Sequence, residues 1–175
     1  MKNTMFAVLL GLALSASAQA ADKFLANFKA GSWTGAVTES VSPALKGKKI
    51  TATTETTADQ VKIVVRVEGA AGQEREEWVV TPTKLTQTEY DAAGKSVATY
   101  AADVRTAQTN TARTYDIHCT NRTANQCDNN IDFHNHWALV ASGHTFKYIV
   151  NGLKDKANPD SLGTRHIFEF AHKGP

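Results

Sequence analysis

Two histidines separated by one residue stand near the end of the chain, in the segment IDFHNHW at 131–137. Alternate side chains of an extended strand share a face, so Asp132, His134 and His136 are expected in line on one face. Two imidazoles at this spacing can share a metal ion, and a nearby carboxylate can bind the ion or orient a ring. With His118 from the preceding strand as a third ligand, the spacing indicates a candidate zinc or copper site.

The same segment also has an interpretation without a metal. Ile131, Phe133 and Trp137 fall on the face opposite the two histidines. If that apolar face lines the interior of the protein, the histidines point to solvent. The letters resemble part of a nuclease motif as well, but that nuclease needs a helix after the motif and no helix is predicted here.

The two cysteines, Cys119 and Cys127, lie in the asparagine-rich segment HCTNRTANQCDNN. In an oxidising compartment such a pair most simply forms a disulfide, which stabilises a loop of this length by about 2.5 kcal/mol. A zinc site made of both cysteines with His118 and His134 is the alternative. Their spacing matches no common zinc module, so the disulfide is the prediction.

The first 20 residues, MKNTMFAVLLGLALSASAQA, have the pattern of a secretory signal peptide. Lys2 supplies the charged start, a short apolar stretch follows, and Ala18-Gln19-Ala20 provides a small-residue cleavage site. Cleavage after Ala20 leaves one domain, residues 21–175, in the periplasm or outside the cell. No later stretch is long and apolar enough to span a membrane, so the protein is not expected to be membrane-spanning.

Charge in the mature chain is almost balanced. Lys2 is the only charged residue of the first 20, so 18 Lys and Arg remain against 17 Asp and Glu. Nucleic-acid binding would require a basic excess or a cluster of Lys and Arg, and neither is present. Acidic residues such as Glu76 and Glu77 in the run REE are typical of a solvated strand face.

Nearly all of the mature sequence has the period-two pattern of half-buried antiparallel strands. A short amphipathic helix is predicted in DKFLANFKAG at 22–31, and Val61, Ile63 and Val65 then mark one face of a strand. Turn signals separate the strands, as in GAAG at 69–72 and DAAG at 91–94. The chain is therefore predicted to be all-β, an antiparallel up-and-down barrel of about ten strands with a short N-terminal helix; closure would leave no exposed sheet edge. The other predicted strands are WTGAVTES, KITATTETT, EREEWVV, KLTQTEY, SVATYAAD, ARTYDIHC, NIDFHNHWALV, HTFKYIV and TRHIFEFAH.

The segment FLANFKAGSWTGAV places a short helix directly before Gly31-Ser32-Trp33 and the first strand. This arrangement resembles the lipocalin superfamily, particularly the lipocalin-like domains of bacterial exported proteins. The resemblance implies a ligand-holding barrel with Trp33 at its closed floor and an arginine of the last strand, Arg165, covering that ring. The T-D-Y motif of classical lipocalins has no match, because Thr114-Tyr115-Asp116 has a different order.

A barrel of eight or more strands can hold one small ligand. The leading hypothesis is therefore binding of a small, largely apolar molecule, although the same rings could fill a solid core. The alternatives are metal binding through the histidine pair and a non-catalytic role as an envelope interaction protein or inhibitor. No enzyme motif such as G-x-S-x-G, a P-loop or H-E-x-x-H is present, so catalysis is not expected. The predicted ligand-binding side chains are Trp78, Tyr90, Tyr100, Phe133, Trp137, Tyr148, Phe168 and Phe170.

Overall fold

The computed structural model describes residues 22–69, 75–104, 109–121, 136–153 and 162–174. A 3-10 turn, η1 (Leu25–Asn27), comes before the strands. The strands are β1 (Gly31–Ser40), β2 (Lys49–Thr56), β3 (Val61–Val67), β4 (Arg75–Val80), β5 (Lys84–Tyr90), β6 (Ser96–Val104), β7 (Ala112–Asn121), β8 (His136–Ala141), β9 (Thr145–Leu153) and β10 (Leu162–His172).

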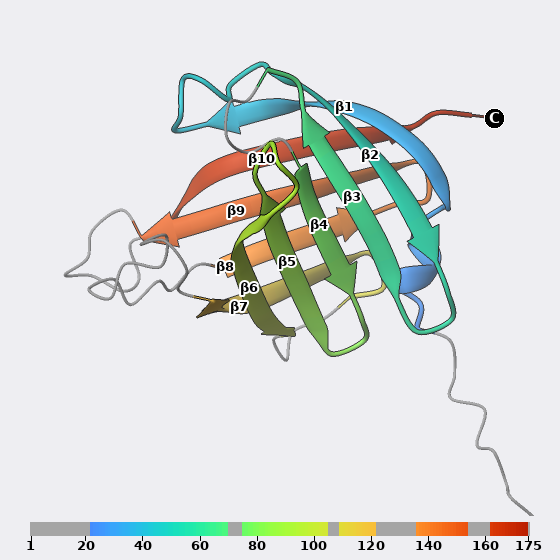
Figure 1. Ribbon diagram of the computed structural model, residues 1–175. Helices are drawn as coiled ribbons and strands as arrows, with labels where there is room; N and C mark the ends of the chain where they lie inside the picture. The colour runs from blue at the N-terminus through green and yellow to red at the C-terminus, as the bar shows by residue number, and fades with distance from the viewer. Residues whose placement is uncertain (1–21, 70–74, 105–108, 122–135, 154–161, 175) are drawn as a thin grey trace, which may run out of the picture.

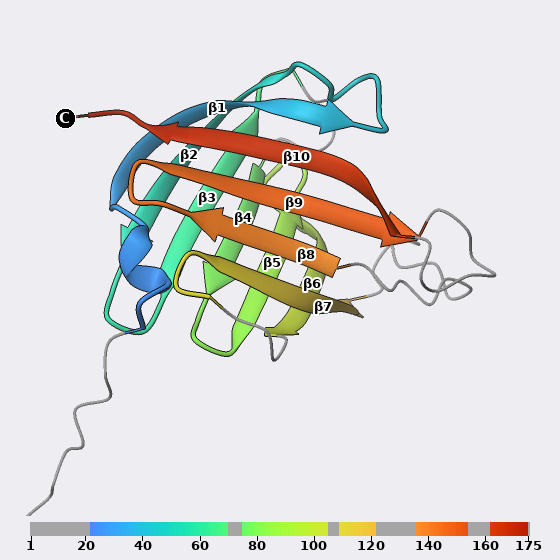
Figure 2. The same cartoon turned by 180° about the vertical axis from the view of Figure 1, so that it is seen from behind.

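The ten strands form one closed antiparallel barrel. Each strand pairs with its neighbours in the chain, and β1 closes the ring by pairing with β10. The strands on one side of the barrel cross those on the other side steeply, as Figures 1 and 2 show. The predicted ten-stranded up-and-down barrel is confirmed at this level, and every strand edge is paired.

The predicted N-terminal helix is wrong, since the segment forms only the three-residue turn η1. Its backbone bonds run from Asn27 N–H to Phe24 O and from Phe28 N–H to Leu25 O, and Phe28 is already extended. An isolated helix this short is unstable, because nucleation fixes several residues for one hydrogen bond. The apolar spacing instead reflects three side chains buried against one end of the barrel.

That end of the barrel, which we call the floor, is closed by residues 22–30. The Phe24, Leu25 and Phe28 side chains are buried, and Gly143 N–H in the β8–β9 turn donates to Asn27 O. Trp33 lies above them at 1% exposure and donates its indole N–H to Thr54 Oγ1 over 2.9 Å. The floor position that the resemblance implied for Trp33 therefore agrees with the structure.

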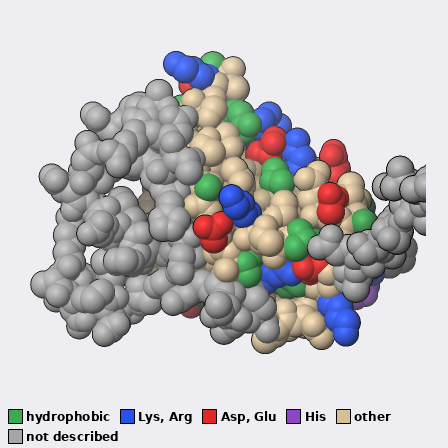
Figure 3. All heavy atoms as spheres, turned by 90° about the horizontal axis from the view of Figure 1, so that it is seen from below, with side chains coloured by type: hydrophobic (Ala, Val, Ile, Leu, Met, Phe, Trp, Pro, Cys, Tyr) green, Lys and Arg blue, Asp and Glu red, His purple; other side chains and the backbone are tan. Residues whose placement is uncertain are grey.

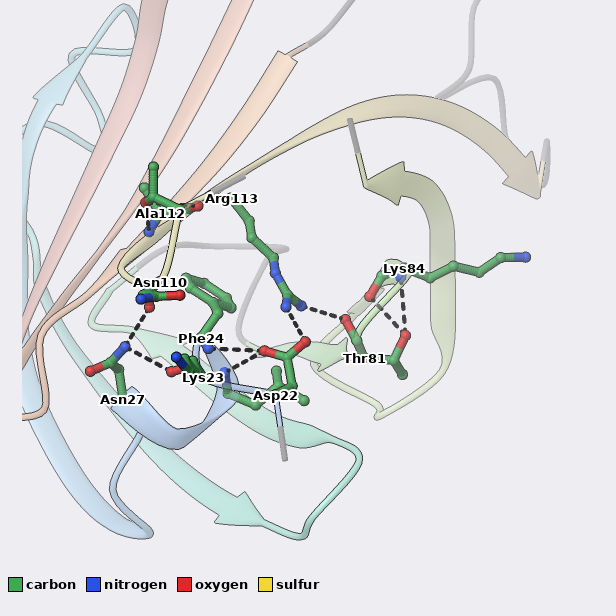
Figure 4. Close-up of polar contacts among 11 residues, drawn as sticks. Asp22, Lys23, Phe24, Asn27, Thr81, Lys84, Asn110, Ala112 and Arg113 are labelled. Atoms are coloured by element: carbon green, nitrogen blue, oxygen red, sulfur yellow. Dashed lines mark hydrogen bonds and ion pairs between the residues drawn. The ribbon is translucent and has the colours of Figure 1, made fainter. Parts of the chain in front are cut away.

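The arginine at the floor is Arg113 on β7, and it forms an ion pair with Asp22 (Figure 4). Its guanidinium also donates to Thr81 O over 3.0 Å and lies 4.6 Å from the centre of the Phe24 ring. The prediction for Arg165 is wrong, because the register pairs Trp33 with His172 and leaves Arg165 at a bulge farther along β10. The His172 ring, 4.8 Å from the Trp33 ring, occupies the place expected for the arginine.

Gly35 allows β1 and β10 to approach closely. A Cβ atom at this position would lie 1.7 Å from the carbonyl oxygen of Glu169 on β10. The next inward side chain on either side along β1 is buried, Trp33 toward the floor and Val37 beyond. Glycine is required here because the backbone of the neighbouring strand occupies the space of a side chain.

The described part of β8 shows which of its apolar side chains face inward. Trp137, Leu139 and Ala141 are buried in the barrel, whereas Ala138 and Val140 are only partly buried. The large apolar residues of this strand therefore face inward. The side chain of His136 lies outside the described part of the structure. His134 lies outside the described residues.

Candidate functional site

Two glutamates point into the barrel at the end opposite the floor, which we call the rim. Glu76 is the second residue of β4 and Glu89 the last but one of β5, and the register places them directly opposite each other. Each is only 8% exposed. Directly opposite residues of antiparallel strands have Cβ atoms about 5 Å apart, so two acidic side chains share a small buried space.

A chain of hydrogen bonds connects Glu76 to the middle of the barrel. Glu76 Oε2 accepts from the indole N–H of Trp78 over 2.9 Å and from Gln87 Nε2 over 3.0 Å. The Tyr148 hydroxyl donates to Gln87 Oε1 over 2.7 Å. Trp78 and Tyr148 are almost completely buried, so the network fixes the Glu76 carboxyl group in one orientation.

Burial changes the acidity of these groups. Burial and the neighbouring Glu89 charge together raise the pKa of Glu76 to about 7, and the Trp78 hydrogen bond opposes the rise. Burial, with the charges of Glu89 and Glu76, also raises the pKa of Tyr100 to about 12, and burial raises the pKa of Tyr148 strongly. Glu76 can therefore change its protonation state near neutral pH while both phenols keep their protons.

Aromatic rings from five strands line the barrel beside this network. The Trp78 and Tyr148 rings lie 4.2 Å apart, and Trp137 meets Tyr148 edge-on at 5.6 Å and Tyr100 at 5.7 Å. Phe168 lies 5.8 Å from Tyr148. The closed barrel thus brings together six predicted ligand-binding residues in its interior, namely Trp78, Tyr100, Trp137, Tyr148, Phe168 and Phe170.

A polar atom of this interior has no hydrogen-bond partner in the described part of the chain. It is the indole Nε1 of Trp137, whose side chain is 4% exposed. Trp137 and Tyr115 are directly paired across β8 and β7. A buried donor without an acceptor costs about 1–3 kcal/mol, so such atoms are uncommon and each asks for an explanation.

The structure places one of the other two predicted ligand residues, Tyr90, away from the interior. Tyr90 lies on the outer face of β5, where the Arg75 guanidinium lies 3.9 Å from its ring centre, so it does not line the interior. Phe133 lies outside the described residues. The backbone of His118 lies on β7 opposite Ala101.

No group of three or more His, Cys, Asp or Glu side chains that could hold a metal occurs among the described residues. Cys127 lies outside those residues, as does His134. The metal site and the Cys119–Cys127 disulfide both stay predictions.

Sequence reasoning missed the Glu76–Glu89 pair. The interpretation of REE as a solvated face holds for Glu77, which forms an outer ion pair with Lys62 at 3.2 Å, but it is wrong for Glu76. The sequence did contain a signal of burial. Glu76 falls on the same face of the alternating strand as the large apolar residues Trp78 and Val80. Glu89 falls on the same face of β5 as Leu85.

The outer surface has a mixed charge pattern. In the coloured part of the face in Figure 3, Lys and Arg side chains are interspersed with Asp and Glu side chains and with scattered hydrophobic side chains. Cross-strand ion pairs such as Lys147 with Glu169, at 2.7 Å, contribute to this pattern. In the described part of the chain, no helix is long and apolar enough to cross a membrane.

Comparisons of the chain with models of known protein families, with curated proteins and with solved structures found no match. Function is therefore inferred from the geometry of the barrel interior.

Proposed function

We propose that this chain is an exported, lipocalin-like protein that binds a small, largely apolar organic molecule inside its barrel. The barrel interior is divided along its axis. Near the floor the rings of Trp33, Phe146 and Phe170 pack together, with Phe146 and Phe170 stacked at 4.3 Å. Toward the rim Glu76, Gln87 and Glu89 face inward among apolar and aromatic side chains. A few polar groups in a mostly apolar lining are the usual composition of a ligand site.

The observation that carries the proposal is the unpartnered, buried indole N–H of Trp137. Its ring contacts Tyr148, which is connected through Gln87 to the buried Glu76 carboxyl group. A barrel with a solid core would gain stability from apolar side chains at positions 76 and 89, because burying a polar group costs free energy. Buried groups with shifted pKa values that converge in one place are typical of functional sites. A bound molecule with a hydrogen-bond acceptor would give the Trp137 indole N–H the partner that the described part of the chain does not supply.

Export is proposed from the sequence of the first 20 residues. Residues 1–20 lie outside the described residues, and their charged start, apolar stretch and small-residue end support a periplasmic or secreted location. A binding protein outside the cytoplasm would meet its ligand in the surrounding medium.

The test is native mass spectrometry of the mature protein purified from the compartment to which it is exported. We expect an additional mass that disappears on denaturation and is recovered by organic extraction. Trp137→Phe keeps the ring and removes only the unpartnered N–H, so it should retain less of the molecule. Tyr90→Phe, on the outer face, is the matched control and should retain the wild-type amount. Protein that is always empty, and that also fails to take up the extract of its own compartment, would contradict the proposal.

A further inference from the structure

We propose that Ser40 and His166 form a nucleophile and its general base at the rim of the barrel, and that the pair hydrolyses small carboxylic esters with an apolar group. This activity goes beyond the proposed ligand binding and does not depend on it. Ser40 is the last residue of β1, and His166 lies on β10, 126 residues farther along the chain. Residues this far apart form no sequence motif, so only closure of the barrel brings them together.

Both residues lie on the inner face of the barrel. His166 shares its face of β10 with the buried Phe168 and Phe170, and its ring centre lies 6.2 Å from that of Phe168. The register pairs Ser40 with His166, and directly opposite residues of antiparallel strands share a face. Because β1 starts at the floor, near Trp33, its last residue lies at the rim. Ser40 and His166 are only partly buried there, so a small molecule can reach them.

A β-bulge in β1 is responsible for the position of Ser40. Val37 is completely buried, and strict alternation from Val37 would place Ser40, three residues later, on the outer face. The register shifts between Val37 and Glu39, so Ser40 comes to lie opposite His166 on the inner face. A second register shift, between Thr164 and His166, occurs where β10 pairs with β9. Bulges are common next to active sites, where they redirect a side chain.

The Ser40 hydroxyl lies within hydrogen-bond reach of a base. Ser40 Oγ is 2.8 Å from His166 Nδ1, which is within the range for a nucleophile and the base that activates it. With the ring proton on Nε2, His166 Nδ1 accepts the Ser40 O–H. Ser40 Oγ also accepts the backbone N–H of Ser42 over 3.0 Å. That N–H stabilises negative charge on Oγ and therefore favours transfer of the hydroxyl proton to the imidazole.

The reaction consumes water and proceeds through an acyl group on Ser40. Ser40 Oγ attacks the ester carbonyl carbon while its proton moves to His166 Nδ1, and the alcohol leaves with that proton as its C–O bond breaks. Water then attacks the acyl group and gives a proton to Nδ1, and the acid leaves as Ser40 Oγ recovers that proton. The Phe168 ring beside His166 suits an apolar group on the substrate.

Covalent labelling with phenylmethylsulfonyl fluoride tests the nucleophile. Ser40 Oγ would form a bond to sulfur, fluoride would leave, and the hydroxyl proton would pass to His166. We expect the mass of the mature protein to rise by that of the sulfonyl group, and peptide mapping to place the group on Ser40. Protein that is not labelled, or that is labelled at another residue, would overturn the proposal. The mapping uses wild-type protein, so it decides the question even if a variant does not fold.

Release of p-nitrophenol from p-nitrophenyl butyrate measures the hydrolysis itself. Ser40→Ala removes the nucleophile and His166→Asn removes the base, so each should lower the rate above buffer by about 100-fold. Ser32→Ala is the matched control, because Ser32 is exposed at the floor end of the same strand and should keep the wild-type rate. Circular dichroism shows whether each variant is folded. A folded Ser40→Ala protein with the wild-type rate would also overturn the proposal.

Discussion

Glu76 on β4 lies directly opposite Glu89 on β5 inside the barrel, and both side chains are buried. The two acids differ from the surface ion pairs of the protein because solvent does not screen them. Burial with the Glu89 charge raises the pKa of Glu76 from 4.5 to about 7. Ionisation of Glu76 therefore lowers the stability of the fold at alkaline pH, and this effect can be measured.

The first prediction concerns stability and pH. Because the folded-state pKa of Glu76 is raised, the native state holds more protons than the unfolded state between pH 4.5 and about 7. The free energy of unfolding should fall as pH rises through this window, by about 3 kcal/mol in total from this group. Glu76→Gln should remove the loss, so the variant is more stable than wild type at pH 8 and equal to it near pH 4. Urea unfolding at both pH values measures this.

Glu77→Gln is the control for that measurement and should follow the wild-type pH profile. A Glu76→Gln variant that is less stable than wild type at pH 8 would show that the carboxylate is stabilised in the fold, contrary to the direction of its pKa shift.

The second prediction concerns the floor. Burial raises the pKa of Asp22, but the hydrogen bond and charge of Arg113 and two backbone N–H donors outweigh it, so the net shift is downward. A lowered pKa means that the stability from Asp22 is present above about pH 4 and is lost as pH falls through the folded-state pKa. Asp22→Asn should therefore cost about 2–4 kcal/mol at pH 7, because Arg113 stays buried without its partner.

Chemical denaturation at pH 7 tests this cost. Asp103→Asn is the control, because Asp103 makes only an exposed 4.0 Å contact with Lys84 and should change stability little. If Asp22→Asn and Asp103→Asn are equally stable, the floor ion pair has no role in holding the N-terminal segment on the barrel.

The third prediction concerns Gly35. Gly35→Ala places a Cβ atom 1.7 Å from the Glu169 carbonyl oxygen, so β1 and β10 must separate. We expect a loss of at least about 3 kcal/mol, or protein that does not fold, since the obstacle is backbone. Gly94→Ala meets no atom within 4 Å and should cost only the strain of its positive φ of 77°. Thermal unfolding of the two variants gives the comparison, and equal melting temperatures would argue against the close strand approach.

The fourth prediction concerns the cysteines. If Cys119 and Cys127 form the disulfide predicted from the sequence, the mature protein should contain no free thiol after denaturation without reductant. A thiol titration before and after reduction measures this, and reduction should lower the free energy of unfolding by about 2.5 kcal/mol. Two reactive thiols in freshly purified protein would instead favour the alternative zinc site with His118 and His134.

Much of the barrel follows from the sequence because the alternation of apolar and polar residues is a local property. In β3, Val61, Ile63 and Val65 are completely buried as the pattern predicts. The order of strands also follows, because short turns connect antiparallel neighbours. The local pattern gave a wrong prediction at η1, because the spacing of its apolar residues fits a short helix as well as a turn packed against the barrel floor.

The candidate site depends on contacts that no local pattern encodes. The register of β4 and β5 decides that Glu76 lies opposite Glu89. The contacts of Trp137 with Tyr100 and Tyr148 require closure of the whole barrel. Glutamate is usually solvated, so the residue type predicted an exposed position for Glu76 and Glu89. Their place in the alternation of each strand predicted a buried position instead.

The sequence alone determined the strands and the up-and-down barrel, because the period-two pattern records that one side of a strand avoids water. The tertiary structure alone decided that Arg113, rather than Arg165, lies at the floor and pairs with Asp22. It alone also placed Glu76 opposite Glu89 near the rim. These pairings join residues that are far apart in the chain or on separate strands, and only register and closure bring them within reach of one another.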